Sequence, residues 1–176
     1  TGKARGKAAK LYQHREEMEI KLREWIGALA NIFFIAAEAG SGKTNLLVEM
    51  QRQYTERGYP SLFIRAGRME KKTLKEQLCY LLNIDSSIAL SEYQNIAGEK
   101  ENPTFILIDG LNEASNAEEL WKEILELSRF FDRGSVKFVI ANRCNSTADM
   151  ERYVIEEADM EYIYGENKDY EKLLSA

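Results

Sequence analysis

The chain has 176 residues, a length that suits one domain with a full core better than two. Its composition, 44% hydrophobic and 30% charged with two prolines, is typical of a folded protein rather than a disordered one. The net charge of −5 argues against binding nucleic acid by bulk electrostatics, so nucleic acid is not an expected partner of this domain alone.

The start of the chain and its cysteines indicate where the protein works. No apolar run reaches the ~20 residues of a membrane helix, and residues 1–10 lack the pattern of a signal peptide, so no membrane is expected. Residues 1–10 are expected to be a basic linker or a cloning remnant, and residues 11–176 a domain from a longer multidomain protein. Cys79 and Cys144 have no ligand-spaced partner, so we expect buried thiols and a cytoplasmic location.

The first predicted elements are a helix, a strand and a second helix. Apolar residues recur at helical spacing between Leu11 and Leu29, which predicts an amphipathic helix. The run NIFFIAA at 31–37 predicts a buried strand. A helix over 44–57 follows, and Gly58 is expected to cap its C-terminus. Its buried face is expected to contain Leu47, Met50 and Tyr54.

A second strand and its helix come next. The run PSLFIRA at 60–66 predicts a strand that starts at Pro60, where a missing N–H does least harm. A helix over 73–82 opens with Thr73 and Glu76 in capping-box register. Its buried face is expected to contain Leu74, Leu78 and Leu82. A short helix near 91–100 is the only element expected between 83 and 102.

Three more strands complete the predicted sheet, at 103–109, 135–141 and 160–165. A helix over 115–131 is expected to open with Ser115 and Glu118 as a second capping box. Its buried stripe is expected to contain Leu120, Ile124, Leu127 and Phe131. A further helix is predicted at 146–157. Apolar strands that alternate with helices predict an α/β fold with a mainly parallel five-stranded sheet, covered by helices on both faces.

The segment AAEAGSGKT at 36–44, between the first strand and its helix, has the chemistry of a phosphate-binding loop. Gly40 and Gly42 permit the positive φ that lets backbone N–H groups surround a phosphate, and the helix adds its N-terminal dipole. Lys43 is expected to reach the β- and γ-phosphates, and Thr44 to bind Mg²⁺. Ala37 replaces the first glycine of the G-x-x-x-x-G-K-[ST] pattern. The residues expected to bind the nucleotide are Glu38, Ala39, Gly40, Ser41, Gly42, Lys43 and Thr44.

Two further groups of polar residues follow predicted strands. We expect the strand of FILIDGLNEA, at 105–114, to lie beside the first strand, where Asp109 would hold Mg²⁺ and Glu113 could activate a water. The fourth strand ends in Asn142 and Arg143, at the edge where parallel sheets bind ligands. Arg143 is therefore expected to approach the γ-phosphate. The predicted catalytic residues are Lys43, Asp109, Glu113 and Arg143, and the predicted metal ligands are Thr44 and Asp109.

Together these motifs resemble the STAND class of signalling ATPases, and within it the NACHT-type nucleotide-binding domain. AGSGKT is similar to the family's phosphate loop, and IANR, ending in Arg143, to its sensor segment. LIDGLNEA is similar to the extended Walker B motif, with Gly110 where many AAA+ proteins have glutamate. LYQHREEMEIKL is similar to the segment that lies near the adenine, which implies nucleotide binding by Arg15, although His14 stands where glycine is usual.

The resemblance covers residues 11–165 and implies a three-layer α/β/α P-loop NTPase core that binds ATP or ADP with Mg²⁺. It also implies a signalling or defence switch, in which ADP holds a closed state and ATP favours an open, homo-oligomerising one. Effector and sensor domains would lie outside this chain. Asn112 replaces the second acidic residue of the Walker B extension, which leaves Glu113 as the nearby candidate base. Hydrolysis is therefore expected to be slow or absent.

Two other functions remain open. A P-loop kinase that phosphorylates a small molecule or nucleoside starts with the same strand, loop and helix. The segment RAGRMEKK at 65–72, with four basic residues, could then form the acceptor site. A nucleotide-binding module without useful hydrolysis is favoured by Asn112. A helicase or transposition-type AAA+ ATPase is disfavoured by the acidic charge balance and by Gly110. The choice of ATP over GTP rests on the resemblance.

Overall fold

The computed structural model describes residues 20–37, 39–85, 94, 96–144, 153 and 160–164. Residues 20–27 are helical and precede β1. The elements that follow are β1 (Ile32–Ala37), α2 (Lys43–Glu56), β2 (Ser61–Arg65), η1 (Ala66–Arg68), α3 (Leu74–Leu82), β3 (Thr104–Asp109), η3 (Leu111–Glu113), α4 (Ala117–Phe130), β4 (Val136–Arg143) and β5 (Met160–Tyr164). The predicted helix residues before 20, most of 91–95 and nearly all of 146–157 lie outside the described residues.

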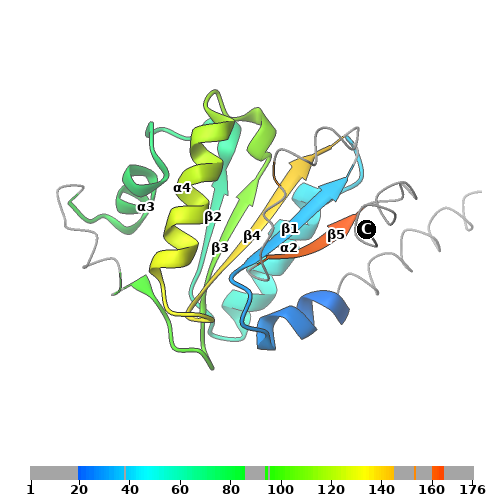
Figure 1. The fold of residues 1–176 in the computed structure, drawn as a ribbon, viewed down its shortest axis with the longest axis vertical. Helices are drawn as coiled ribbons and strands as arrows, with labels where there is room; N and C mark the ends of the chain where they lie inside the picture. The colour runs from blue at the N-terminus through cyan, green and yellow to red at the C-terminus, as the bar shows by residue number, and fades with distance from the viewer. Residues whose placement is uncertain are drawn as a thin grey trace, which may run out of the picture.

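The strands form one sheet in the order β2-β3-β4-β1-β5, and every neighbouring pair is parallel (Figure 1). The parallel α/β architecture predicted from the sequence is confirmed. The expectation that the strand of Asp109 lies beside the first strand is wrong, because β4 lies between β1 and β3. Both strands are apolar runs, and apolarity makes a strand buried without selecting its neighbour. The carboxyl ends of all five strands still meet at one edge.

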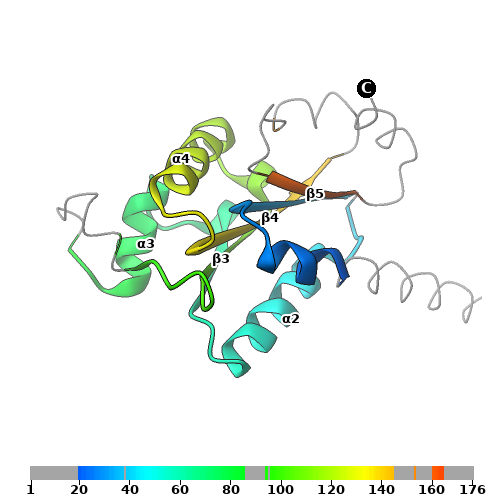
Figure 2. The same cartoon turned by 60° about the horizontal axis from the view of Figure 1, so that its bottom comes forward.

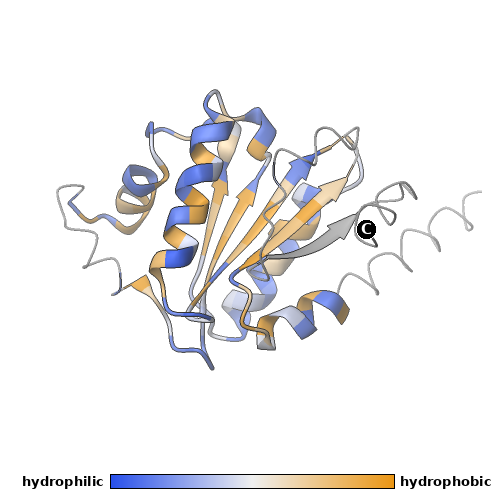
Figure 3. Ribbon diagram, viewed as in Figure 1, coloured by the Kyte–Doolittle hydropathy of each residue, from blue (hydrophilic) through white to orange (hydrophobic). Residues whose placement is uncertain are grey.

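Helices cover both faces of the sheet, with α3 and α4 on one face and α2 and residues 20–27 on the other (Figure 2). Successive strand residues alternate between the two cores, so that Phe34 and Ile140 pack beneath α4 while Phe33 and Val139 pack beneath α2. The apolar strands and the mixed character of the helices are visible in Figure 3. This arrangement gives three layers, and the predicted buried positions on the helix after the first strand are confirmed.

The helix ends show which local signals the chain uses. Gly58 has φ 84° after α2, and the N–H of Tyr59 bonds to the Tyr54 carbonyl at 2.9 Å, which is a Schellman motif. The capping box of Thr73 and Glu76 on α3 is confirmed. Leu82, expected to be buried, is 37% exposed because α3 ends there.

The second predicted capping box is wrong. The helix α4 begins at Ala117, one residue later than a Ser115 cap requires, and its N-cap is Asn116. The side-chain amide of Asn116 instead donates to the carbonyl of Lys72 at 3.1 Å, which ties the start of α4 to the segment before α3. The buried stripe expected on α4 is confirmed, since Leu120 and Ile124 are at most 1% exposed.

A buried lysine holds the first helix against the sheet. The ammonium of Lys137 in β4 donates to the carbonyls of Ala28 and Ala30, both at 2.7 Å, and to that of Trp25 at 3.3 Å. It also lies 4.8 Å from the centre of the Trp25 ring. Burial lowers the pKa of Lys137 to about 8. Lys137 therefore supplies the donors that the carbonyls after residues 20–27 need.

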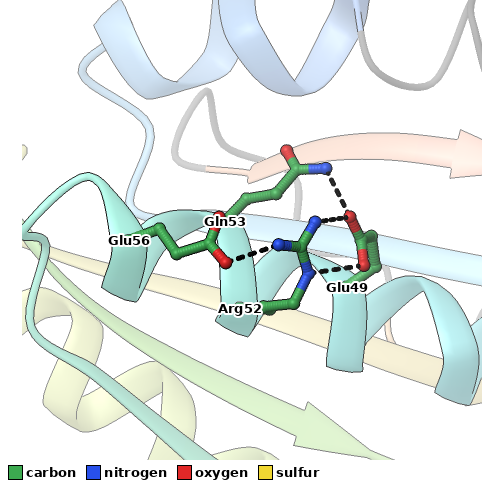
Figure 4. A network of polar contacts seen from close by, with 4 residues as sticks. All are labelled: Glu49, Arg52, Gln53 and Glu56. Atoms are coloured by element: carbon green, nitrogen blue, oxygen red, sulfur yellow. Dashed lines mark hydrogen bonds and ion pairs between the residues drawn. The ribbon is translucent and has the colours of Figure 1, made fainter.

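The outward face of α2 has charged side chains that are exposed to solvent. Arg52 lies between Glu49 and Glu56, one turn away on either side, and pairs with both (Figure 4). Gln53 donates to the same Glu49 carboxylate at 2.9 Å. Exposed pairs of this kind add little to stability. Their effect is to keep this face in water while Leu47, Met50 and Tyr54 fill the core.

Candidate functional site

The loop between β1 and α2 has the backbone that phosphate binding requires. Gly40 has φ 75° and Gly42 has φ 86°, and a Cβ built on either would meet no described atom within 4 Å. Gly42 is the N-cap of α2, and the first turn of that helix has no acidic side chain. The positive end of the helix dipole is therefore available to an anion. Of the predicted nucleotide-binding residues, Ala39 to Thr44 form this loop, whereas Glu38 and Arg15 lie outside the described residues.

Lys43 folds back onto the loop that contains it. Its ammonium donates to the carbonyl of Ala37 at 2.7 Å and to the hydroxyl of Ser41 at 3.2 Å. Burial lowers the pKa of Lys43, and the nearby carboxylate of Asp109 partly offsets that shift. The Lys43 ammonium is thus held inside the loop between β1 and α2, where it could contact a phosphate group.

Thr44 and Asp109 meet although a strand separates β1 from β3. The helix α2 packs against β4, β3 and β2, and its first turn brings Thr44 to the end of β3. The hydroxyl of Thr44 donates to Oδ2 of Asp109 at 2.8 Å. A hydroxyl and a carboxylate at an open edge fit Mg²⁺, which binds few protein oxygens and fills its other positions with water and phosphate. These two residues are the ones that would hold the ion.

Glu113 sits in a space made by two glycines, a feature that sequence reasoning missed. A Cβ on Gly67 would lie 2.9 Å from Cβ of Glu113, and a Cβ on Gly110 would lie 3.0 Å from its Cδ. Gly110 also turns the chain out of β3 with φ 69°. Glu113 is exposed at this edge of the sheet. Its carboxylate is one of the nearby negative charges that raise the pKa of Lys43. The signal for this space in the sequence was Gly67, the glycine that follows the second strand.

Arg143 lies beside the phosphate loop. It pairs in register with Ala37, the last residue of β1, and its side chain is exposed. It also contributes to lowering the pKa of Lys43, as a neighbouring positive charge does. The four predicted catalytic residues, Lys43, Asp109, Glu113 and Arg143, therefore come together at one edge of the sheet.

Two asparagines connect the end of β4 to the loop after β3. The side-chain carbonyl of Asn112 accepts the backbone N–H of Arg143 at 2.9 Å. In return, the side-chain carbonyl of Asn142 accepts the backbone N–H of Asn112 at 2.8 Å. Sequence reasoning treated Asn112 only as a lost acidic residue and gave Asn142 no role. The reciprocal pair joins segments 30 residues apart.

The basic segment after β2 follows the same edge of the sheet. Arg65 pairs in register with Asp109, and the four basic side chains of the segment are exposed: Arg65, Arg68, Lys71 and Lys72. Buried Gln77 of α3 accepts the backbone N–H groups of Glu70 and Lys71 at 3.0 and 3.1 Å. The backbone of this segment is therefore held in place while its charges face the solvent.

No family model matches the chain, and no curated protein matches it. Solved structures with a similar fold include a DNA replication initiation factor (20% identity, 90% of this chain and 48% of that one, TM-score 0.51). Drosophila ORC bound to DNA is also similar (11% identity, 89% and 91%, TM-score 0.58), as is Drosophila ORC bound to GC-rich DNA and Cdc6 (12% identity, 89% and 57%, TM-score 0.56).

The likeness to these structures supports a P-loop NTPase fold for the chain. At such low identity the likeness concerns the fold alone. The chain spans about half the length of the replication initiation factor. Among the described helices, none combines the length and apolarity needed to cross a bilayer.

Proposed function

We propose that this domain is an ATP-binding and slowly hydrolysing switch module of the STAND/NACHT kind, from a signalling or defence protein. The observation that carries the proposal is the hydrogen bond between Thr44 and Asp109. It joins the phosphate loop to a carboxylate at the open edge of the sheet, where a Mg²⁺ ion could bind. The P-loop NTPase fold and the sequence motifs support the same function.

Each residue of the site has a distinct part in this proposal. The loop amides and Lys43 bind the phosphates, while Thr44 and Asp109 hold Mg²⁺, which would neutralise charge on the β- and γ-phosphates. Arg143 contacts the γ-phosphate and so responds to its loss. A nucleotide can shift a conformational equilibrium only by contacts that differ between the two states, and Arg143 supplies such a contact. Effector and sensor domains outside the chain would read the change through homo-oligomerisation.

Slow hydrolysis follows from the arrangement around Glu113. Asp109 is assigned to Mg²⁺ together with Thr44, so Glu113 is the carboxylate left to orient or deprotonate a water. Gly67 and Gly110 leave room for its side chain, because a Cβ at either position would lie 3.0 Å or less from it. Because Asn112 is neutral, the site has one candidate base rather than two.

The test is calorimetric titration of the chain with ATP and with ADP, each with Mg²⁺ and with EDTA, followed by product analysis of the same samples. Mg²⁺-dependent ATP binding with slow release of ADP and phosphate supports the switch module. If wild type binds ATP but releases no ADP or phosphate, as Glu113→Gln also would not, the result would favour a nucleotide-binding module without hydrolysis. Failure to bind either nucleotide would overturn the proposal.

A kinase is the second candidate, and the exposed basic segment is what favours it. Arg65, Arg68, Lys71 and Lys72 lie on a braced backbone next to the strand of Asp109, where an anionic acceptor could bind. Product analysis in the presence of nucleosides and small phosphorylated compounds separates the two functions. Rapid ADP formation only when such a compound is added would identify a kinase.

A further inference from the structure

The strand β4 extends beyond its neighbour β3 at the edge that contains the site. The pairing of these strands ends at Asp109 and Ala141, whereas β4 continues to Arg143. Gly110 donates one more bond to the Ala141 carbonyl at 2.9 Å and then turns the chain away. In a parallel sheet alternate residues direct their N–H groups to the same neighbour, so the N–H of Arg143 points to the side that β3 has left.

The side chain of Asn112 takes the place of the missing strand. Its carbonyl oxygen accepts the N–H of Arg143 at 2.9 Å, as a further residue of β3 would have done. The buried Asn142, 1% exposed, accepts the N–H of Asn112 at 2.8 Å and so fixes the backbone from which that side chain extends. Asn112 itself is exposed, so this contact is not a by-product of core packing.

We propose that Asn112 is a positioning residue for Arg143. By holding the backbone of Arg143, it determines how the guanidinium leaves the sheet edge beside Ala37 and the phosphate loop. An asparagine suits this task because its side-chain carbonyl oxygen accepts the backbone bond. The proposal rests on the proposed function, since it assumes that Arg143 meets the γ-phosphate.

The measurement is the ratio of the dissociation constants for Mg-ADP and Mg-ATP, by calorimetry on the full chain. Wild type should prefer ATP, and Arg143→Ala should lower the ratio about tenfold, the loss of one charge-assisted contact. Asn112→Ala should lower the ratio about threefold or more, with ADP affinity unchanged. The double variant should match Arg143→Ala, because residues that act through one another do not add.

Two control variants test this inference. Asn112→Asp keeps an acceptor oxygen and should keep a ratio nearer to wild type than Asn112→Ala. Asn116→Ala removes another asparagine of the same loop, one that bonds to Lys72, and should leave the ratio unchanged. Thermal melting of each variant reports whether it folds.

The outcomes separate this inference from the proposed function. A wild type that binds neither nucleotide overturns both. A wild-type preference for ATP that Asn112→Ala leaves unchanged overturns the inference alone. A double variant whose loss is the product of the two single losses also overturns it, because Asn112 would then act independently of Arg143.

Discussion

The hydroxyl of Thr44 and the carboxylate of Asp109, 65 residues apart in the chain, are joined by a 2.8 Å hydrogen bond at the carboxyl edge of the sheet. In the presence of Mg²⁺ these oxygens are the ones expected to bind the ion. Asp109→Asn keeps an acceptor for Thr44 but removes the charge that Mg²⁺ needs. We expect Mg²⁺ to improve ATP affinity at least about tenfold in wild type and far less in this variant.

The matched variant is Thr44→Ser, which retains the hydroxyl and should keep most of the Mg²⁺ effect. Titrations of ATP with Mg²⁺ and with EDTA measure both variants. If Mg²⁺ improves the ATP affinity of Asp109→Asn as much as that of wild type, Asp109 does not bind the ion.

Lys43→Ala should reduce ATP affinity while leaving the fold intact. The ammonium lies within the loop, bonded to Ala37 and Ser41, and bound phosphates would lose its positive charge in this variant. We expect a loss of about tenfold or more in ATP affinity, with a change in unfolding free energy of about 1 kcal/mol or less. Lys72→Ala removes the same charge from an exposed position and should leave ATP binding near wild type. Equal affinities of Lys43→Ala and wild type in calorimetry would contradict the assignment.

Gly67→Ala should displace Glu113. The added Cβ would lie 2.9 Å from Cβ of Glu113 and 3.3 Å from its backbone oxygen, so the loop after β3 must shift. Overpacking of this kind costs about 1–3 kcal/mol. Phosphate release should slow, while ADP affinity stays the same because the phosphate loop is untouched.

The control for this variant is Gly27→Ala, where a Cβ meets no described atom within 4 Å. Single-turnover phosphate release and urea unfolding measure both variants. If Gly67→Ala hydrolyses ATP at the wild-type rate, the location of Glu113 does not limit catalysis.

Thr73→Ala and Ser115→Ala should differ although both remove a hydroxyl from the same sequence pattern. Thr73 accepts the N–H of Glu76 at 3.1 Å and caps α3, so its loss should cost about 1 kcal/mol. Ser115 precedes the N-cap of α4, and its loss should change stability by less than about 0.5 kcal/mol. Urea unfolding of the two variants and wild type is sufficient. Equal losses would mean that Ser115 caps α4 in solution.

Lys137→Met should change how stability depends on pH. Burial lowers the pKa of Lys137 from 10.5 to about 8, so between these values the unfolded chain holds a proton that the folded chain has released. The unfolding free energy of wild type relative to Lys137→Met should therefore rise with pH in that window, by up to about 1.4 kcal/mol per pH unit. Below pH 8 the difference should be constant. Urea unfolding at several pH values checks this, and a difference that stays flat throughout would show an ordinary pKa.

Local signals in the sequence predicted much of the fold. Continuous apolar runs located β1, β3 and β4, and the pairing of Thr73 with Glu76 located the start of α3. These succeeded because each depends on residues close together in the chain. The same pattern at Ser115 failed, because the N-cap of α4 is Asn116, whose side chain bonds to Lys72 outside the helix.

The parts that could not be predicted depend on partners far away in the sequence. The candidate site residues Lys43, Asp109 and Arg143 were named from motifs, but the insertion of β4 between β1 and β3 was not predicted. The roles of Asn112 and Lys137 are invisible in sequence, because each is one polar residue whose partners lie about 30 to 110 positions away. The burial of Lys137 and the hydrogen bonds of both residues follow from topology rather than from local pattern.

The central position of β4 also determines when, during synthesis, the site can form. Both strands that pair with β1 come later in the chain, β4 at Val136–Arg143 and β5 at Met160–Tyr164. Until Val136 has left the ribosome, β1 has neither of its neighbours, and β3 can pair only with β2. A growing chain therefore exposes an apolar edge, and the edge lacks Arg143, until β4 enters between β1 and β3. A ligand that binds at this edge can therefore stabilise only the finished sheet.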